Sequence, residues 1–192
     1  MKILRADKLS DSEWLNLFKV TYRLPGRDDP RAWMLASRQK APRCITGRFE
    51  SPDAVIIVAF HRRRAKLVVT REYRVPLDGY EVGFPAGLVD PGETVVDAAR
   101  RELREETGLD VTRFLSASPP LYSSAGMTDE SFTLVTVECE GEPSNKALEA
   151  SEVIEVLFVS PVEAGRLCAD SSLKFDAKAW LVLTRFAATG KV

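Results

Sequence analysis

Runs of apolar residues, separated by glycine, proline and charged positions, divide the chain into short strands and helices. Continuous or alternating apolar runs of four to eight residues are typical of strands. Such runs predict strands at 15–22, 32–37, 54–60, 66–71, 80–84, 131–138 and 153–159. Apolar positions at helical spacing predict helices at 93–107, 161–169 and 175–188. In the first of these, Glu93 would lie in the first turn, and Val96, Ala99 and Leu103 would face the core. The order of these strands and helices predicts an α/β (α+β) fold, a mixed sheet with helices on both faces in an α/β/α sandwich.

The character of the sequence changes near residue 50. Residues 1–50 are charged and interrupted by the turn-rich segment 25–30, whereas 54–60 is continuously apolar. We therefore expect a small N-terminal β element over residues 1–50 and the main domain over residues 51–192. Residues 61–64, between two predicted strands, are expected to form a polar turn.

Composition excludes some classes of function. The net charge is −1, so no basic field favours a nucleic-acid partner. No run approaches the roughly 20 apolar residues of a membrane span, and we expect neither a signal peptide nor a membrane anchor. Three widely spaced cysteines indicate thiols in a reducing cytoplasm rather than a disulfide framework. His61 is the only histidine, which argues against a histidine base or metal site.

Three glutamates of the predicted helix 93–107 stand at positions i, i+3 and i+4. Glu102, Glu105 and Glu106 therefore share one helix face. Like charges at this spacing repel by roughly a few tenths of a kcal/mol per pair in an isolated helix. A hard divalent cation with a preference for oxygen ligands offsets that repulsion. A solvated acidic face, softened by neighbouring arginines, is the alternative, and the glutamates alone do not decide between the two.

The spacing around the glutamates favours the metal site. From Gly87 to Leu109 the chain follows the pattern Gly-x5-Glu-x7-Arg-Glu-Leu-x-Glu-Glu-x-Gly-Leu. This is the Nudix signature with every fixed position filled, and so long a spaced match is far more specific than a short glycine motif. Over roughly residues 50–190 the chain resembles the Nudix hydrolase family, and the elements predicted above agree with that family's fold.

The resemblance implies a metal centre. Glu102, Glu105 and Glu106, together with the backbone carbonyl of Ala86, would bind Mg²⁺ (or Mn²⁺). The metal would polarise diphosphate oxygens and lower the pKa of a bound water. The implied reaction is attack by water on a phosphorus of a substituted nucleoside diphosphate.

The resemblance also assigns roles to the other motif residues. Arg101 would hold Glu93 or a neighbouring carboxylate in place, and it joins Glu105 among the catalytic candidates. Gly87 and Gly108 would serve the loop–helix–loop geometry, where the backbone turns sharply or approaches another group closely.

Segments that flank or overlap the start of the motif are similar to ADP-ribose pyrophosphatases. They lie at 68–76, 84–93, 126–130 and 175–178. The similarity implies hydrolysis of ADP-ribose to AMP and ribose 5-phosphate by a homodimer whose N-terminal elements cross to the partner. It further implies that Trp33 stacks on adenine and that Arg38 and Arg74 contact the base or a phosphate. Core or dimer packing for Trp33, and surface ion pairs for the two arginines, are the alternatives.

The subfamily takes its general base from a glutamate in a loop before the strand that precedes the closing helices. That position corresponds first to Glu152 and second to Glu149. A loop glutamate without a catalytic role is the alternative, and geometry rather than pKa should decide.

Two positions depart from the subfamily and leave the substrate open. Gly83 stands where the subfamily usually has glutamate, while Glu81 lies on the same strand face about 7 Å away. Ala125 replaces the usual proline before Gly126. GDP-mannose, ADP-glucose, another nucleoside diphosphate compound and a dNTP remain alternative substrates. A non-catalytic ligand-sensing module is the third class, although the motif glutamates are all present and no helix-turn-helix pattern is visible.

Overall fold

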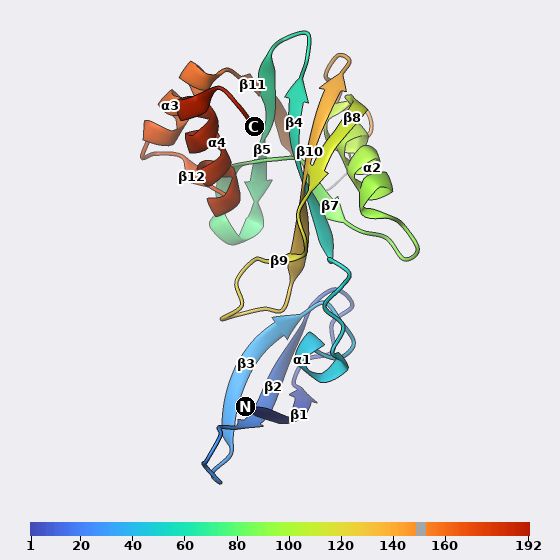
Figure 1. The fold of residues 1–192 in the computed structure, drawn as a ribbon, viewed down its shortest axis with the longest axis vertical. Helices are drawn as coiled ribbons and strands as arrows, with labels where there is room; N and C mark the ends of the chain where they lie inside the picture. The colour runs from blue at the N-terminus through green and yellow to red at the C-terminus, as the bar shows by residue number, and fades with distance from the viewer. Residues whose placement is uncertain (149–152) are drawn as a thin grey trace. The chain divides into compact units, whose positions relative to one another are not determined.

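The computed structural model describes residues 1–148 and 153–192, which fall into two compact units. The first unit comprises Met1–Asp53 and Pro119–Phe132, and the second comprises Ala54–Ser118 and Thr133–Val192. Figure 1 shows the elements of both along the chain. The loop 119–132 therefore joins the N-terminal segment in one unit, although it is remote from it in sequence.

The first unit is built on an antiparallel sheet in the order β1 (Lys2–Lys8), β2 (Asn16–Arg23) and β3 (Arg31–Ser37). Strand β1 was missed by the sequence analysis, because much of it is exposed and it carries no apolar run. The backbone N–H of Ala36 donates to the carbonyl of Met127 at 2.8 Å, which ties β3 to the loop 119–132.

A buried polar network holds the rest of the first unit together. It starts at the short helix α1 (Arg43–Thr46). The Arg43 guanidinium pairs with Asp53 at 2.9 Å, and both side chains are only 5% exposed. The other carboxylate oxygen of Asp53 accepts a hydrogen bond from the backbone N–H of Ser131 at 2.9 Å. Because a buried charge is costly unless it is paired, these bonds fix segment 43–53 against the loop.

The second unit is organised around a mixed sheet. Its main strand order is β12-β6-β5-β4-β10-β8, with β11 beside β5 and β7 beside β4. The β12–β6 pair is parallel and the β4–β5 pair is antiparallel. The strands are β4 (Ala54–His61), β5 (Lys66–Arg74), β6 (Gly79–Gly83), β7 (Ala86–Leu88), β8 (Asp110–Ala117), β10 (Ser131–Glu140), β11 (Ile154–Val159) and β12 (Lys174–Phe175). The 3-10 turn η1 (Val75–Leu77) follows β5. The two-residue strand β9 (Leu121–Tyr122) belongs to the first unit, where it pairs with Ser131 and Phe132 at the start of β10.

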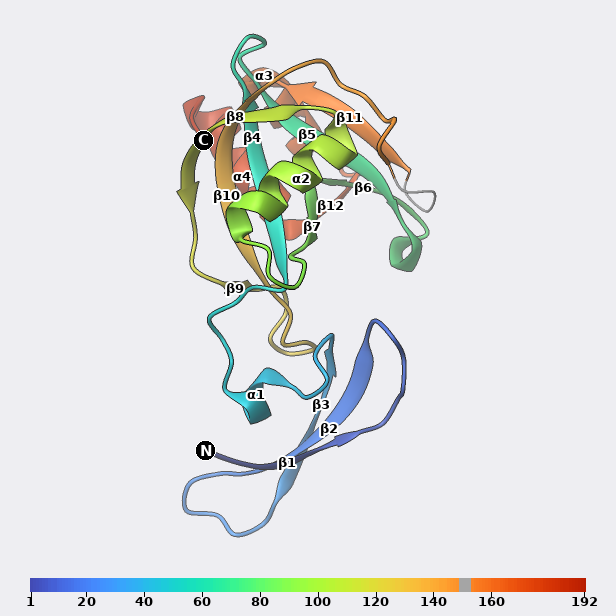
Figure 2. The same cartoon turned by 90° about the vertical axis from the view of Figure 1, so that its right-hand side faces the viewer.

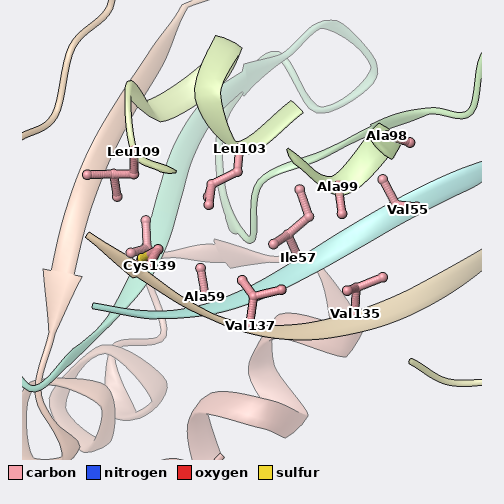
Figure 3. Close-up of a cluster of buried hydrophobic side chains, with 11 residues drawn as sticks. Val55, Ile57, Ala59, Ala98, Ala99, Leu103, Leu109, Val135, Val137 and Cys139 are labelled. Atoms are coloured by element: carbon pink, nitrogen blue, oxygen red, sulfur yellow. The ribbon is translucent and has the colours of Figure 1, made fainter. Parts of the chain in front are cut away.

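Helices cover both faces of this sheet, which confirms the predicted α/β/α layers (Figures 1 and 2). Helix α2 (Val95–Thr107) lies on one face, and α3 (Pro161–Ala169) and α4 (Ala177–Thr189) lie on the other. Beneath α2, fully buried side chains of the helix meet those of β4 and β10, including Leu103, Ile57 and Val137 (Figure 3). In the part of the chain that the structure describes, no helix is long and apolar enough to cross a membrane.

The start of α2 corrects the sequence analysis. Glu93 was expected in the first turn, but the helix begins at Val95, because Thr94 is the N-cap and its hydroxyl accepts from the backbone N–H of Asp97. Val96 was expected in the core and is 38% exposed, so the prediction was wrong there. The half-turn offset leaves Glu93 in the loop ahead of the helix, where it can face Arg101.

His61 was also misplaced, since it ends β4 instead of forming a polar turn. Its side chain is 2% exposed, and its Nε2 lies 3.0 Å from the carbonyl oxygen of Gly141. The buried imidazole is therefore satisfied by a hydrogen-bond partner within the fold. The local sequence does not reveal that partner, because Gly141 is remote from His61 in the chain.

Candidate active site

The three glutamates of α2 lie beside the short strand β7, and the backbone of that strand allows one of them to come very close. A Cβ atom built on Gly87 would lie 1.9 Å from Cδ of Glu102. No side chain larger than hydrogen fits that gap. Gly87 is therefore required by the position of the Glu102 carboxylate and not by an unusual backbone angle. At the other end of α2, Gly108 has a φ of 74° and ends the helix in the left-handed conformation.

Arg101 is the centre of the charged cluster. Its guanidinium forms a bidentate salt bridge with Glu93, in which Nε donates to Oε1 at 2.9 Å and Nη2 donates to Oε2 at 2.8 Å. The same group donates to Glu102 at 2.7 Å, to Glu105 at 3.2 Å and to the carbonyl of Leu88 at 2.9 Å. The hydrogen bonds from Arg101 lower the pKa of Glu93, and those to Glu93 raise the pKa of Arg101. This network joins the loop before α2 to the helix face that carries the carboxylates.

Glu106 is the most buried of the three helix glutamates, at 5% exposure for the whole residue. Its Oε2 accepts a hydrogen bond from the backbone N–H of Ala86 at 3.3 Å. Ala86 and Glu106 are twenty positions apart in sequence, and this bond brings the two predicted metal-binding positions together. Glu105, in contrast, has a side chain that is 46% exposed.

The donor set of this cluster fits a hard divalent cation. Glu102, Glu105 and Glu106 offer oxygen ligands from one helix face, which is the ligand type that Mg²⁺ and Mn²⁺ prefer. Within residues 1–148 and 153–192, however, no three histidine, cysteine or acidic side chains are gathered tightly enough to form a ready-made metal cage. Glu102 and Glu105 are instead both paired with the guanidinium of Arg101.

A small polar recess opens where the sheet divides near Ala86. Strand β4 pairs with β5 at its end, over residues 59–61, and with β7 at its start, over residues 54–56. Strand β5 instead pairs with β6 over residues 70–74, so the strands part between these ladders. The recess has a volume of about 20 Å³, and its lining includes Thr70, Glu72, Arg74, Glu81, Gly83 and Ala86.

Arg74 belongs to this recess, and acidic side chains surround it. Its guanidinium lies 2.9 Å from Glu72 and 3.5 Å from Glu81. Burial raises the pKa of Glu81, Asp176 raises it further, and Arg74 opposes both effects. Arg74 was predicted either to contact the substrate or to form surface ion pairs. The structure contains the ion pairs, and it also places Arg74 in the recess that adjoins Ala86.

Trp33 and Arg38 belong to the first unit, where both contact the segment 126–130. The Trp33 indole is 49% exposed, and its Nε1 donates to the carbonyl of Gly126 at 3.2 Å. Arg38 pairs with Glu130 at 2.7 Å. Two segments that were matched to the subfamily separately are therefore neighbours in space. The predicted bases, Glu152 and Glu149, lie outside the described residues and stay predictions. Measuring turnover and metal binding in Glu152→Gln and in Glu149→Gln would test them, because loss of the base should lower turnover while the metal still binds.

Two further groups near the site, Thr70 and the carbonyl of Leu88, were not predicted from the sequence. Thr70 ends the otherwise apolar run 67–70 and is 2% exposed. A polar residue closing a buried strand segment was the available signal for it. The Leu88 carbonyl left no signal, because a backbone acceptor is the same at every position.

Comparison with known proteins decides the family. A family model described as NUDIX domain matches residues 50–181. The chain belongs to the Nudix family. A nudix hydrolase of Caenorhabditis elegans is 40% identical over 116 residues, which cover 57% of this chain and 52% of that protein. The ADP-ribose pyrophosphatase of Saccharomyces cerevisiae is 32% identical over 156 residues, covering 78% of this chain and 65% of the yeast enzyme.

Solved structures show the same Nudix fold. The crystal structure of an ADP compounds hydrolase superposes with a TM-score of 0.72 at 24% identity, covering 100% of this chain and 96% of that one. This Nudix chain spans about half to two thirds of the two relatives above. Nudix hydrolases in general act on small nucleotides and need divalent metal ions.

Proposed function

We propose that this Nudix protein uses Mg²⁺ or Mn²⁺ to hydrolyse the diphosphate of a nucleoside diphosphate sugar, with ADP-ribose as the preferred substrate and AMP and ribose 5-phosphate as products. The observation that carries the proposal is the arrangement around Gly87. There Glu102 approaches the β7 backbone, and Arg101 joins Glu93, Glu102 and Glu105. Similarity to the yeast ADP-ribose pyrophosphatase supports the choice of substrate.

Each motif residue has a distinct task in this proposal. Glu102, Glu105, Glu106 and the Ala86 carbonyl hold the metal, which supplies charge neutralisation on the diphosphate and a water of lowered pKa. Arg101 positions the carboxylates through its bonds to Glu93, which stays ionised because these bonds lower its pKa. Glu106, which is bonded to the Ala86 N–H, fixes the loop against the helix. Glu152, or failing it Glu149, takes the proton from the attacking water.

A substrate panel tests the proposal directly. With Mg²⁺ present, we expect release of AMP from ADP-ribose to be faster than release of AMP from ADP-glucose or of GMP from GDP-mannose. Chromatography of the nucleotide products measures each rate. The ADP-ribose assignment would be overturned if GDP-mannose or a dNTP had the highest kcat/KM, and no turnover of any nucleotide would favour a ligand-sensing module. Omission of the metal is the control, and it should abolish turnover.

The N-terminal unit supports a second proposal, that residues 1–50 form the dimer element and cross to the partner chain. Leu17 on β2 and Met34 on β3 share one face of the sheet and are 41% and 46% exposed in the single chain, while Trp33 is 49% exposed on the other face. Exposed apolar side chains on one sheet favour association. We expect light scattering at micromolar concentration to give the mass of a dimer, and a monomer at that concentration would contradict it. Met34→Glu should shift the equilibrium toward monomer, whereas Lys191→Glu, at an exposed position outside residues 1–50, is the charge control and should leave the mass unchanged.

The three cysteines support a reducing compartment such as the cytoplasm, because all three are free thiols and Cys139 is buried. Burial raises the pKa of the Cys139 thiol to about 12, so this group is not reactive at neutral pH. Alkylation of the folded protein should therefore modify the exposed Cys44 first.

A further inference from the structure

The recess beside Ala86 contains a hydroxyl group that the fold itself does not use. Thr70 lies on β5 directly opposite Gly83 on β6. Its residue is 2% exposed, and it lines the recess. No side-chain hydrogen bond joins its Oγ1 to a residue that the structure describes, yet Oγ1 is not one of the fully buried unpaired polar atoms of these residues. The hydroxyl is therefore accessible from the recess, while the rest of the residue is buried. Valine would fill the same strand position but would have no hydroxyl to offer a ligand.

Gly83 keeps the space in front of this hydroxyl open. A Cβ atom at position 83 would lie 3.8 Å from Thr70 Oγ1, in ordinary contact, so the glycine is not required by packing. Its backbone is not in the left-handed region either. Gly83 is the last residue of β6, and glycine in a strand often marks a place where another group approaches closely. The pair of Thr70 and Gly83 therefore leaves an accessible hydroxyl beside open space.

The size and chemistry of the recess match a single hydroxyl group. Its volume of about 20 Å³ holds one water-sized group, since a cavity needs roughly 10–15 Å³ for one. The Thr70 hydroxyl can donate, and the Glu81 carboxylate, which lines the same recess, can accept. A ligand hydroxyl satisfies both at once, because it accepts from Thr70 and donates to Glu81. Ala86 also lines the recess and bonds to Glu106, so the ligand group lies next to the catalytic carboxylates.

We propose that Thr70 and Glu81, in the space left by Gly83, form a specificity subsite that binds one hydroxyl of the sugar attached to the substrate diphosphate. The inference rests on the proposed hydrolase function and deepens it. The subsite selects substrates that carry a polyhydroxylated group next to the diphosphate. It discriminates against diphosphates that lack such a group, because the Thr70 hydroxyl then gains no partner from the substrate.

The decisive comparison is Thr70→Val against Thr70→Ser, assayed with Mg²⁺ on two probes. ADP-ribose carries the sugar, and the β-methyl ester of ADP has the diphosphate without it. We expect Thr70→Val to lower kcat/KM for ADP-ribose by about tenfold or more and to change hydrolysis of the methyl ester less than about twofold. Thr70→Ser keeps the hydroxyl and should stay within about threefold of the wild type on ADP-ribose.

Thermal unfolding gives a readout that does not depend on activity. Because the Thr70 hydroxyl makes no hydrogen bond within the described residues, Thr70→Val should keep the Tm within about 2–4 °C of the wild type while it lowers turnover. Gly83→Ala fills the recess and should lower kcat/KM for ADP-ribose in the same way, with a Tm at or above that of the wild type. Thr112→Val on β8, away from the recess, is the matched control and should leave kcat/KM unchanged.

The outcomes separate the two proposals. If the wild type hydrolyses neither probe, the proposed function fails. If it hydrolyses ADP-ribose and Thr70→Val retains full kcat/KM, the function stands and the subsite is overturned. An equal loss on both probes, or failure of Thr70→Ser to restore the rate, also overturns the subsite, because Thr70 then supports the strand and not the sugar.

Discussion

Replacing Glu106 by glutamine should lower kcat for Mg²⁺-dependent hydrolysis by at least about a hundredfold, with the fold intact. The amide keeps the size of the side chain and an oxygen that can accept the Ala86 N–H, to which Glu106 Oε2 is bonded at 3.3 Å. It removes the negative charge that a divalent cation needs at this position, and loss of several kcal/mol of charge stabilisation is equivalent to about two or more powers of ten in rate. Steady-state kinetics on ADP-ribose measures the effect.

Two further measurements make the Glu106 prediction specific. Mn²⁺ binding, followed by electron paramagnetic resonance, should weaken in Glu106→Gln while the Tm changes by only a few degrees. The matched control is Glu142→Gln, whose side chain is 83% exposed and pairs only at the surface with Arg64. This control should retain full turnover. Near-wild-type activity of Glu106→Gln with Mg²⁺ would remove Glu106 from the metal site and, with it, the main support for the assignment of this helix face.

Replacing Gly87 by alanine should nearly abolish turnover, although it adds a single methyl group. The new Cβ would lie 1.9 Å from Cδ of Glu102 and 2.3 Å from its second carboxylate oxygen. No rotation of the methyl group relieves that overlap, so the Glu102 carboxylate must leave its place beside β7. Because the displaced atoms are the far end of a flexible side chain, the fold itself should be little destabilised. The displacement should cost about a hundredfold or more in kcat/KM, since misplacement by about 1 Å has effects of that size.

A glycine elsewhere in the same unit provides the comparison. Gly165 lies within α3, and a Cβ there would meet its nearest atom, Cβ of Ala187, at 3.7 Å. Gly165→Ala should therefore leave activity unchanged and raise the free energy of unfolding by about 0.5–1 kcal/mol, because alanine is the better helix former. Denaturant unfolding and steady-state kinetics on both variants check the pair. Wild-type kcat/KM in Gly87→Ala would show that Glu102 need not occupy its place beside β7.

The network around Arg101 explains why the signature keeps residues that are distant in sequence. Glu93 lies in the loop ahead of α2, because Thr94 is the N-cap and the helix begins at Val95. From this loop Glu93 reaches Arg101 on the helix. The Leu88 carbonyl accepts from the same guanidinium. Arg101 therefore connects the loop, the short strand β7 and the helix. The arginine supports the geometry of the candidate metal site through these neighbours.

The sequence by itself determined the layers, the class of the fold and the segment that carries the chemistry. Buried strands such as β4 and β10 can be recognised from continuous or alternating apolar residues, because their side chains fill a core that excludes water. The signature predicted the carboxylate helix because metal ligands on a helix must recur at fixed spacing. Strands β1 and β8 escaped detection, since most of their residues are exposed and so carry no apolar pattern. Their pairing depends on backbone hydrogen bonds, which every sequence can make.

Only the tertiary structure decided which separate segments meet. It brought the loop 126–130 to Trp33 and Arg38, and it placed Thr70, Glu81 and Gly83 around one recess beside Ala86. Spacing in the chain cannot supply such contacts, because strand pairing joins positions that are remote in sequence. The sequence placed Gly87 in the signature, but it did not explain why glycine is required at this position. The reason is the carboxylate of Glu102, which comes so close to the backbone of residue 87 that no side chain fits between them.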